Sequence, residues 1–306
     1  VSPYHTNETF VELARKLEAM GCHSICIKDM SGLLKPYVAE DLVLKLKAAV
    51  NVPIELHTHC TSGFGSMTYL KAIEAGVDII DTALAPFSND TSQPCTETMI
   101  ETLVGTPYDT GLDRHKLTPV SKYFLKVKQD LIKEFNLKGY FDVNPNVLDF
   151  QIPGGMLSNL TNQLKEQGME DKYQDLLDEM PRVRADLGYP PLVTPSSQIV
   201  GTMATFNVIM GERYKMVPRE FKDLARGKFG HTPKPIEKEF LAKIGIKDSE
   251  IVTDCAIEDA KENTVAQFRE ELAGKGYAGA SEEDVLSYAL FPQVAEEFFR
   301  TKGRMK

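Results

Sequence analysis

Short apolar runs alternate with longer amphipathic segments along the N-terminal third of the chain. The runs that have the length of buried strands lie at 23–28, 53–58 and 77–83. The segments in which apolar residues recur with helical periodicity lie at 7–20, 36–49, 66–75 and 94–104. Strands of about five residues that alternate with helices of ten or more predict a parallel sheet joined by right-handed crossovers.

The alternation changes after residue 105. An amphipathic helix is expected at 117–134 and one more strand at 147–152. The helices expected after that lie at 156–167, 170–187, 195–210, 217–226, 235–244, 256–273, 281–289 and 292–301. We therefore predict an α/β chain with the C-terminal half of a TIM (β/α)8 barrel over 1–155 and an all-helical domain over 156–306. Because a barrel needs eight strands, we expect roughly half a barrel, on the order of 150 residues, before Val1.

Composition and charge narrow the class of protein. The 306 residues carry a net charge of −9 and no long basic run, which argues against nucleic acid as a partner. No apolar run approaches the length that crosses a bilayer, although docking to a membrane protein stays open. Five cysteines without a Cys-x-x-Cys pair, and no signal peptide, indicate a reducing, cytoplasmic compartment. No Gly-x-Gly-x-x-Gly follows a predicted strand, which argues against a dinucleotide-binding fold.

Two histidines end the predicted strand at 53–58. Because side chains alternate along a strand, His57 and His59 point to the same face, where two imidazoles are suited to hold a metal ion. Active sites of barrels lie at the strand ends, which favours a metal site over two hydrogen-bonded surface histidines. Two ligands do not complete such a site, since a catalytic metal needs a third ligand, usually a carboxylate, and an open position.

Lys28 ends the predicted strand at 23–28 in the same way. A lysine at this place is most often solvated or ion-paired, and a protonated ammonium cannot ligate a metal. Addition of CO2 would turn it into a carbamate, an anionic oxygen donor, and burial would favour that adduct by lowering the lysine pKa. Spacing alone favours the solvated lysine. The adjacent Asp29 points to the other side of the strand and is interpreted as an ion pair or a loop cap.

Three small hydroxylic segments follow predicted strands or precede predicted helices. Residues 61–63 and 91–94 could offer backbone N–H groups to an anion, but we favour helix N-caps. Thr194 precedes Pro195 and an apolar helix, so by composition it is an N-cap with proline at the first helical position. Nothing local makes Thr194 catalytic.

Four motifs together resemble the biotin-dependent carboxyltransferase family, which includes the oxaloacetate decarboxylase alpha subunit, the transcarboxylase 5S subunit and the carboxyltransferase domain of pyruvate carboxylase. The motifs are residues 24–32, 56–63, 151–160 and 193–201. They occur in the family's order, and the resemblance runs from Val1 to the final helices. The amino-acid sequences of segments 151–160 and 68–76 resemble the decarboxylase and transcarboxylase members more than the other members of the family.

The resemblance implies a fold, a metal and a mechanism. The helical domain would cover the barrel mouth. A divalent metal, with zinc as first choice and manganese or cobalt as alternatives, would be held by His57, His59 and the carbamate of Lys28, together with an aspartate from the first barrel strand. Thr194 would carry a proton between biotin and the enol of pyruvate, while a carboxyl group passes between oxaloacetate and biotin. Biotin would arrive on a carrier domain or subunit absent from this chain, and a homodimer and membrane decarboxylase subunits are the further partners expected.

The first functional interpretation is thus a carboxyltransferase most like the oxaloacetate decarboxylase alpha subunit. The alternative within the family is the B subunit of pyruvate carboxylase or a transcarboxylase 5S-type enzyme. An acyl-CoA lyase or Claisen-type synthase is less favoured, because it would need neither a carbamate at Lys28 nor Thr194 as a shuttle. A non-catalytic scaffold that holds the biotin carrier is the alternative outside enzymes.

If the first-strand aspartate lies before Val1, the 306-residue chain alone should hold metal weakly and should not transfer carboxyl groups. Spectrophotometric measurement of oxaloacetate decarboxylation by the purified chain checks this expectation. Turnover at a rate typical of the family would contradict it.

Overall fold

The computed structural model describes most of the chain and divides it into two compact units. The described residues are 2–135, 145, 147–152, 156, 160, 164, 168–252 and 265–301. The first unit comprises Val1–Ala225 and His231–Ser249, and the second comprises Arg226–Gly230 and Glu250–Lys306. The boundary predicted at residue 155 lies outside the described residues and stays a prediction.

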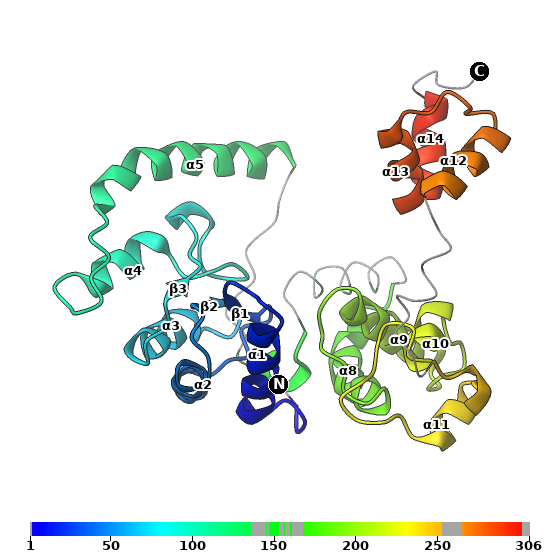
Figure 1. Cartoon of the computed structure of the whole chain (residues 1–306), viewed down its shortest axis with the longest axis horizontal. Coiled ribbons are helices and arrows are strands. Elements are labelled where there is room, and N and C mark those ends of the chain that lie inside the picture. Colours follow the sequence, from blue (N-terminus) through cyan, green and yellow to red (C-terminus); the bar gives the residue numbers. More distant parts are fainter. Residues whose placement is uncertain are drawn as a thin grey trace. The chain divides into compact units, whose positions relative to one another are not determined.

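A three-stranded parallel sheet lies at the centre of the N-terminal part (Figure 1). Its strands, in spatial order, are β1 (Ile25–Asp29), β2 (Ile54–Thr58) and β3 (Ile79–Ile80). The helices between and after them are α1 (Asn7–Ala19), α2 (Pro36–Ala49), α3 (Gly65–Glu74) and α4 (Thr96–Leu103), with a 3-10 turn η1 (Ala85–Phe87). The predicted alternation of strands and helices is confirmed, although β3 is shorter than the run at 77–83.

The helices bury one face of the sheet. In β2 the side chains of Ile54, Leu56 and Thr58 are buried, whereas the intervening Glu55 and His57 are only half-buried. Two apolar clusters form on the buried side, and α2 contributes to both. The clusters include Val11, Ala14, Leu42, Leu46 and Ile54 in one, and Val43, Leu56, Tyr69, Ala72 and Met99 in the other. Alternation along β2 therefore separates an apolar face from a polar face.

The parallel register extends the polar face to β1. Lys28 pairs with His57, and Cys26 pairs with Glu55. Cys26 and Lys28 are both exposed, whereas Ile25 and its alternating neighbours are half-buried. Residues that pair across two parallel strands project to the same side, so Lys28 and His57 share the polar face.

The strand predicted at 147–152 is wrong: Val147–Phe150 form a helical turn, α6. Val147 and Phe150 are buried together at a spacing of three residues, which is a helical spacing. Gln151 then adopts a left-handed backbone with φ of 57°, and this ends the turn. A short apolar run does not distinguish a strand from a buried helix, and the tertiary contacts decide here.

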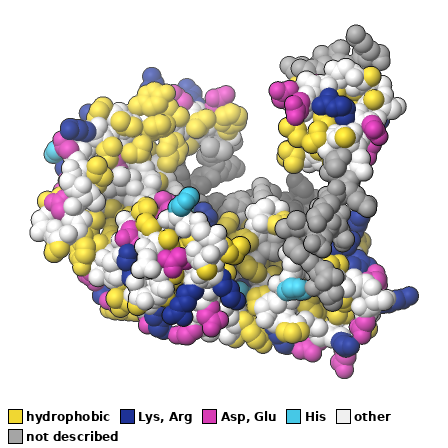
Figure 2. Space-filling model, in the orientation of Figure 1, with side chains coloured by type: hydrophobic (Ala, Val, Ile, Leu, Met, Phe, Trp, Pro, Cys, Tyr) yellow, Lys and Arg dark blue, Asp and Glu magenta, His cyan; other side chains and the backbone are white. Residues whose placement is uncertain are grey.

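Helix α5 (Arg114–Glu134) extends the predicted 117–134 and has no buried residue. Phe124 contacts Phe87 of η1, and Ser121 donates a hydrogen bond to Glu97 of α4. Figure 2 shows hydrophobic side chains gathered over this helix. The exposed ones are Val120, Tyr123, Leu125 and Leu131.

Helices make up the rest of the described chain, as predicted. In the first unit they are α8 (Tyr173–Asp186), α9 (Ser196–Met210), α10 (Arg219–Ala225) and α11 (Lys238–Lys243), with a 3-10 turn η2 (Glu170–Lys172). A further 3-10 turn, η3 (Asp248–Glu250), lies at the boundary between the units. In the second unit they are α12 (Val265–Gly274), α13 (Glu282–Leu290) and α14 (Pro292–Thr301), packed around Leu272, Val285 and Phe299. Much of the predicted helices 156–167 and 256–273 lies outside the described residues. Within the described part, no helix combines the length and the apolar character needed to cross a membrane.

Tyr69 ties the ends of two strands together from inside the core. Its side chain is fully buried, and its hydroxyl donates to the carbonyl of Asp81 at 2.6 Å and accepts from the N–H of Thr58 at 3.2 Å. Tyr69→Phe leaves both backbone groups without this partner and should lower the free energy of unfolding by about 1–3 kcal/mol. Urea denaturation of the chain measures this change. Tyr37→Phe on α2 is the matched control, because Tyr37 is 74% exposed, and an equal loss in both variants would contradict the prediction.

Candidate functional site

His57 and His59 converge at the end of β2. Their Nε2 atoms lie 3.1 Å apart. The Nδ1 of His57 lies 2.7 Å from Oδ2 of Asp81, and the Nδ1 of His59 lies 2.5 Å from the carbonyl oxygen of Thr91. A carbonyl and a carboxylate accept hydrogen bonds, so both Nδ1 atoms carry protons. The Nε2 atoms of the two rings therefore face each other, and an Nε2 atom without a proton would offer its lone pair at this place.

This geometry fits a metal ion. Two nitrogens that bind one divalent ion at about 2.0–2.1 Å lie about 3.0–3.4 Å apart, and the observed separation falls in that range. A hydrogen bond from the distal ring nitrogen to a carboxylate or carbonyl is the usual support of a metal-bound histidine. Burial lowers the pKa of His59, which favours the neutral, ligating form. The amide Nε2 of Gln93 lies 3.3 and 3.4 Å from the two Nε2 atoms and is within reach of both lone pairs.

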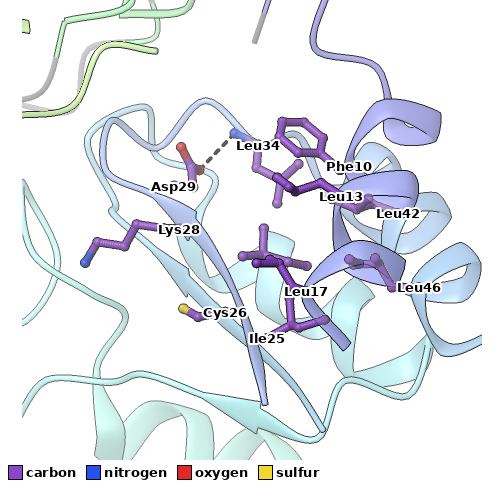
Figure 3. A pocket seen from close by; sticks show the side chains of 12 residues that line it. Phe10, Leu13, Leu17, Ile25, Cys26, Lys28, Asp29, Leu34, Leu42 and Leu46 are labelled. Atoms are coloured by element: carbon purple, nitrogen blue, oxygen red, sulfur yellow. Dashed lines mark hydrogen bonds between the residues drawn. The ribbon is translucent and has the colours of Figure 1, made fainter. Parts of the chain in front are cut away.

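The histidine pair requires further donors. Among the described residues, no group of three or more His, Cys, Asp or Glu side chains could hold a metal ion. Lys28 lies next to His57 across the strand pair, on the same face of the sheet. Its side chain is exposed and extends away from the apolar side chains packed behind β1 (Figure 3). The structure thus places Lys28 and His57 at paired positions of β1 and β2, and His59 directly after β2.

The loop after β1 is fastened to the end of β2. The carboxylate of Asp29 accepts hydrogen bonds from the N–H groups of Leu33 and Leu34, both at 2.9 Å, and from the hydroxyl of Thr58 at 2.7 Å. The interpretation of Asp29 as a loop cap is therefore confirmed. Gly32 has a φ of 66°, and a Cβ there would overlap the carbonyl oxygen of His59. The close approach of the two backbones requires glycine at this position.

The two hydroxylic loops are not helix caps, contrary to prediction. Helix α3 begins after Phe64 and α4 begins after Cys95, each without a side-chain cap. The hydroxyl of Ser62 instead donates to the carbonyl of Gly32. The loop at 91–94 supports His59 through the carbonyl of Thr91. Contacts between segments distant in sequence have displaced the local capping bonds.

Thr194 is not an N-cap either. Helix α9 begins at Ser196 with Pro195 at the cap position and no side-chain cap bond. Ser196 donates to the carbonyls of Pro191 and of Val193, the latter at 2.8 Å, and so closes the turn itself. Thr194 is exposed, and within the described parts of the chain its hydroxyl has no hydrogen-bond partner. Neither burial nor a capping bond holds the side chain of Thr194.

Two pockets flank β1, and they differ in chemistry. The larger, of about 300 Å³, is lined mainly by apolar side chains of α1, α2 and β1 (Figure 3). The smaller, of about 190 Å³, lies between the end of β1 and the segment that precedes Thr194. Its polar lining comes from His5, Lys28, Asp29, Ser31, Gln151 and Arg184, and its apolar lining includes Pro191, Leu192 and Val193. This second pocket places Lys28 opposite the residues next to Thr194.

Sequence reasoning missed the residues that support the ligands. Asp81 directly follows β3, so the strand-end argument that was applied to His57 could have identified it. No comparable feature of the sequence pointed to Gln93 or to the carbonyl of Thr91. Arg184 lies inside a helix, and its contacts became apparent only in the structure.

Comparisons with known proteins identify relatives along the whole chain. A family model described as "Conserved carboxylase domain" matches residues 147–306, and one described as "HMGL-like" matches 4–123. The B subunit of pyruvate carboxylase from Methanocaldococcus jannaschii is 49% identical over 306 residues, which is 100% of this chain and 53% of that protein. The methylmalonyl-CoA carboxyltransferase 5S subunit of Propionibacterium freudenreichii subsp. shermanii is 43% identical and is matched over 60% of its length.

Comparison with solved structures identifies relatives of the same kind. The carboxyl transferase domain of Rhizobium etli pyruvate carboxylase, solved with 3-hydroxypyruvate, superimposes with a TM-score of 0.87 at 30% identity. The match covers 99% of this chain and 52% of that one. The predicted fold class is confirmed by this likeness. The chain spans about half the length of the relatives that it matches.

The support from Asp81 can be tested by metal binding. Asp81→Ala removes the acceptor for Nδ1 of His57, and such a loss should lower Zn²⁺ affinity by about 10–100-fold. Competition with a chromophoric chelator measures the affinity of the purified chain. Asp78→Ala is the matched control, because the carboxylate of Asp78 bonds to Lys47 and to the N–H of Ile54 and, among the described residues, makes no hydrogen bond to either histidine. Unchanged affinity in Asp81→Ala would show that this carboxylate does not orient a ligand.

Proposed function

Since the chain belongs to the biotin-dependent carboxyltransferase family, we propose that it carries the site at which a carboxyl group passes between biotin and a 2-oxo acid. The relatives named above are a pyruvate carboxylase B subunit and a transcarboxylase 5S subunit. These relatives support the alternative interpretation, a pyruvate carboxylase B subunit or a transcarboxylase 5S-type enzyme, better than they support an oxaloacetate decarboxylase alpha subunit. Pyruvate is the proposed acceptor and oxaloacetate the proposed product.

One observation carries the proposal. The Nε2 atoms of His57 and His59 converge with both Nδ1 atoms anchored. Lys28, which pairs with His57 across the two strands, lines a pocket together with residues 191–193, just before Thr194. Because each Nδ1 atom is bonded to a different segment, the Nε2 atoms of both rings are directed to one place, as joint ligation of a metal ion requires. The arrangement suits a site that binds a small anion beside a divalent cation.

His57 and His59, with Lys28 once it has reacted with CO2, would hold the metal. Zinc, manganese and cobalt all accept imidazole and carboxylate-type oxygen donors, so these residues favour none of the three. When bound, a divalent ion lowers the energy of an enolate by stabilising its negative oxygen. Lys28 is exposed here, so the described residues alone do not provide the burial that would promote its carbamate.

Thr194 is proposed to move the proton. Transfer of the carboxyl group from carboxybiotin to pyruvate breaks an N–C bond and a methyl C–H bond, and forms a C–C bond and a biotin N–H bond. The hydroxyl of Thr194 would accept the methyl proton and donate its own proton to the biotin nitrogen, which balances the exchange without solvent acid. An exposed hydroxyl without a fixed partner can turn between the two atoms.

Biotin is proposed to reach the site on a carrier domain or subunit outside these 306 residues. The homodimer stays a prediction, and the named relatives give no support to membrane decarboxylase subunits. An acyl-CoA lyase or Claisen-type synthase is the second candidate, because the HMGL-like match covers 4–123. The conserved carboxylase match over 147–306, which includes Thr194, favours the carboxyltransferase.

Carboxylation of Lys28 separates the two candidates. Lys28→Ala should lower carboxyl transfer by at least about 100-fold, because it removes one metal donor, whereas Lys35→Ala, in the nearby loop, should leave the rate unchanged. In the holoenzyme with its biotin carrier, isotope-labelled bicarbonate should yield a lysine carbamate signal by NMR that is absent from Lys28→Ala. An active holoenzyme without that signal would favour the lyase or synthase.

A further inference from the structure

Arg184 is a charged side chain that is buried. It belongs to α8 and is only 4% exposed. Burial lowers the pKa of its guanidinium, because the charged form loses hydration. Arginine is rarely buried to this extent unless its hydrogen bonds are used. The contacts of Arg184 therefore indicate what its burial achieves.

The guanidinium joins two segments that are distant in sequence. Its Nε donates to the carbonyl of Pro190 at 2.9 Å, and its Nη1 donates to Oε1 of Gln151. Pro190 opens the segment that leads to Thr194, and Gln151 follows α6 with a left-handed backbone. A planar guanidinium directs its N–H groups at fixed angles, so the two acceptors are held in a defined relation to each other.

The segment that bears Thr194 is thus fastened at both ends. Arg184 holds its beginning through Pro190, and Ser196 holds its end through the carbonyls of Pro191 and Val193. Arg184 and Gln151 also line the 190 Å³ pocket, together with Lys28. The backbone is fixed beside the pocket, whereas the side chain of Thr194 is exposed.

We propose that Arg184 is a positioning residue for carboxyl transfer: by binding Pro190 and Gln151 it holds the segment at 190–195 so that Thr194 stays next to the pocket that Lys28 lines. Arg184 acts through the backbone and does not touch the reacting atoms. The inference rests on the proposed role of Thr194. A misplacement of the hydroxyl should slow the proton transfer and leave the binding of pyruvate largely intact.

A double-mutant cycle tests the proposal in the holoenzyme with its biotin carrier. Arg184→Ala should lower kcat for pyruvate carboxylation by about 10–100-fold, with KM for pyruvate changed by less than about 3-fold. In a Thr194→Ala background the same substitution should change kcat by less than about 3-fold, because the group that it positions is already absent. Arg182→Ala is the matched control: Arg182 lies on the same helix, is 63% exposed and pairs with Glu179.

The possible outcomes distinguish a failure of the positioning role of Arg184 from a failure of the proposed function. Losses that multiply in the double mutant would overturn the positioning role, since Arg184 would then act independently of Thr194. Wild-type kcat in Thr194→Ala would instead overturn the proposed function. Should Arg184→Ala fail to fold by circular dichroism, Arg184→Lys and Gln151→Ala enter the same cycle. Each removes part of the same pair of hydrogen bonds, and non-additivity with Thr194→Ala is again the expected result.

Discussion

The register between β1 and β2 is the constraint on which the site depends. Pairing of Lys28 with His57 places both on the polar face, while Ile54 and Leu56 are buried beneath the helices. A slip of one residue would turn His57 toward the core and expose Leu56, so burial of β2 specifies the register strongly. The positions of the proposed ligands are thus a consequence of the hydrophobic core.

The core also helps to determine which atoms of His57 face His59. Tyr69, fully buried, binds the carbonyl of Asp81, whose carboxylate in turn fixes the ring of His57. The loop after β1 reaches the same place from the other side through Asp29 and Thr58. Stability and ligand geometry are therefore coupled, and substitutions far from the pocket should alter both. A barrel strand end provides this coupling because its backbone is held by neighbouring strands and its loops pack on one another.

Periodicity predicted the repeating units and the strand ends, since both follow from local patterns of apolar residues. It placed His57, His59 and Lys28 correctly at the ends of β2 and β1. It failed at 147–152, where an apolar run suits either a strand or a buried helical turn, and at the capping residues. Ser62 bonds to Gly32, thirty positions away in the chain, and no local rule contains that contact. The same limit hid Arg184, whose acceptor Gln151 lies in another segment.

The residues proposed to bind metal and the residue proposed to transfer a proton differ in how firmly their side chains are held. Metal ligation needs donors held in place, and His57 in β2 and His59 directly after it both have anchored rings. Proton transfer needs a hydroxyl that faces two atoms in turn, and Thr194 has an exposed side chain on a fixed backbone. A capping bond, expected from the sequence, would have occupied that hydroxyl. In the structure the helix starts at Ser196, and within the described residues the hydroxyl of Thr194 makes no capping bond. Arg184 and Ser196 bind the backbone of the preceding residues instead.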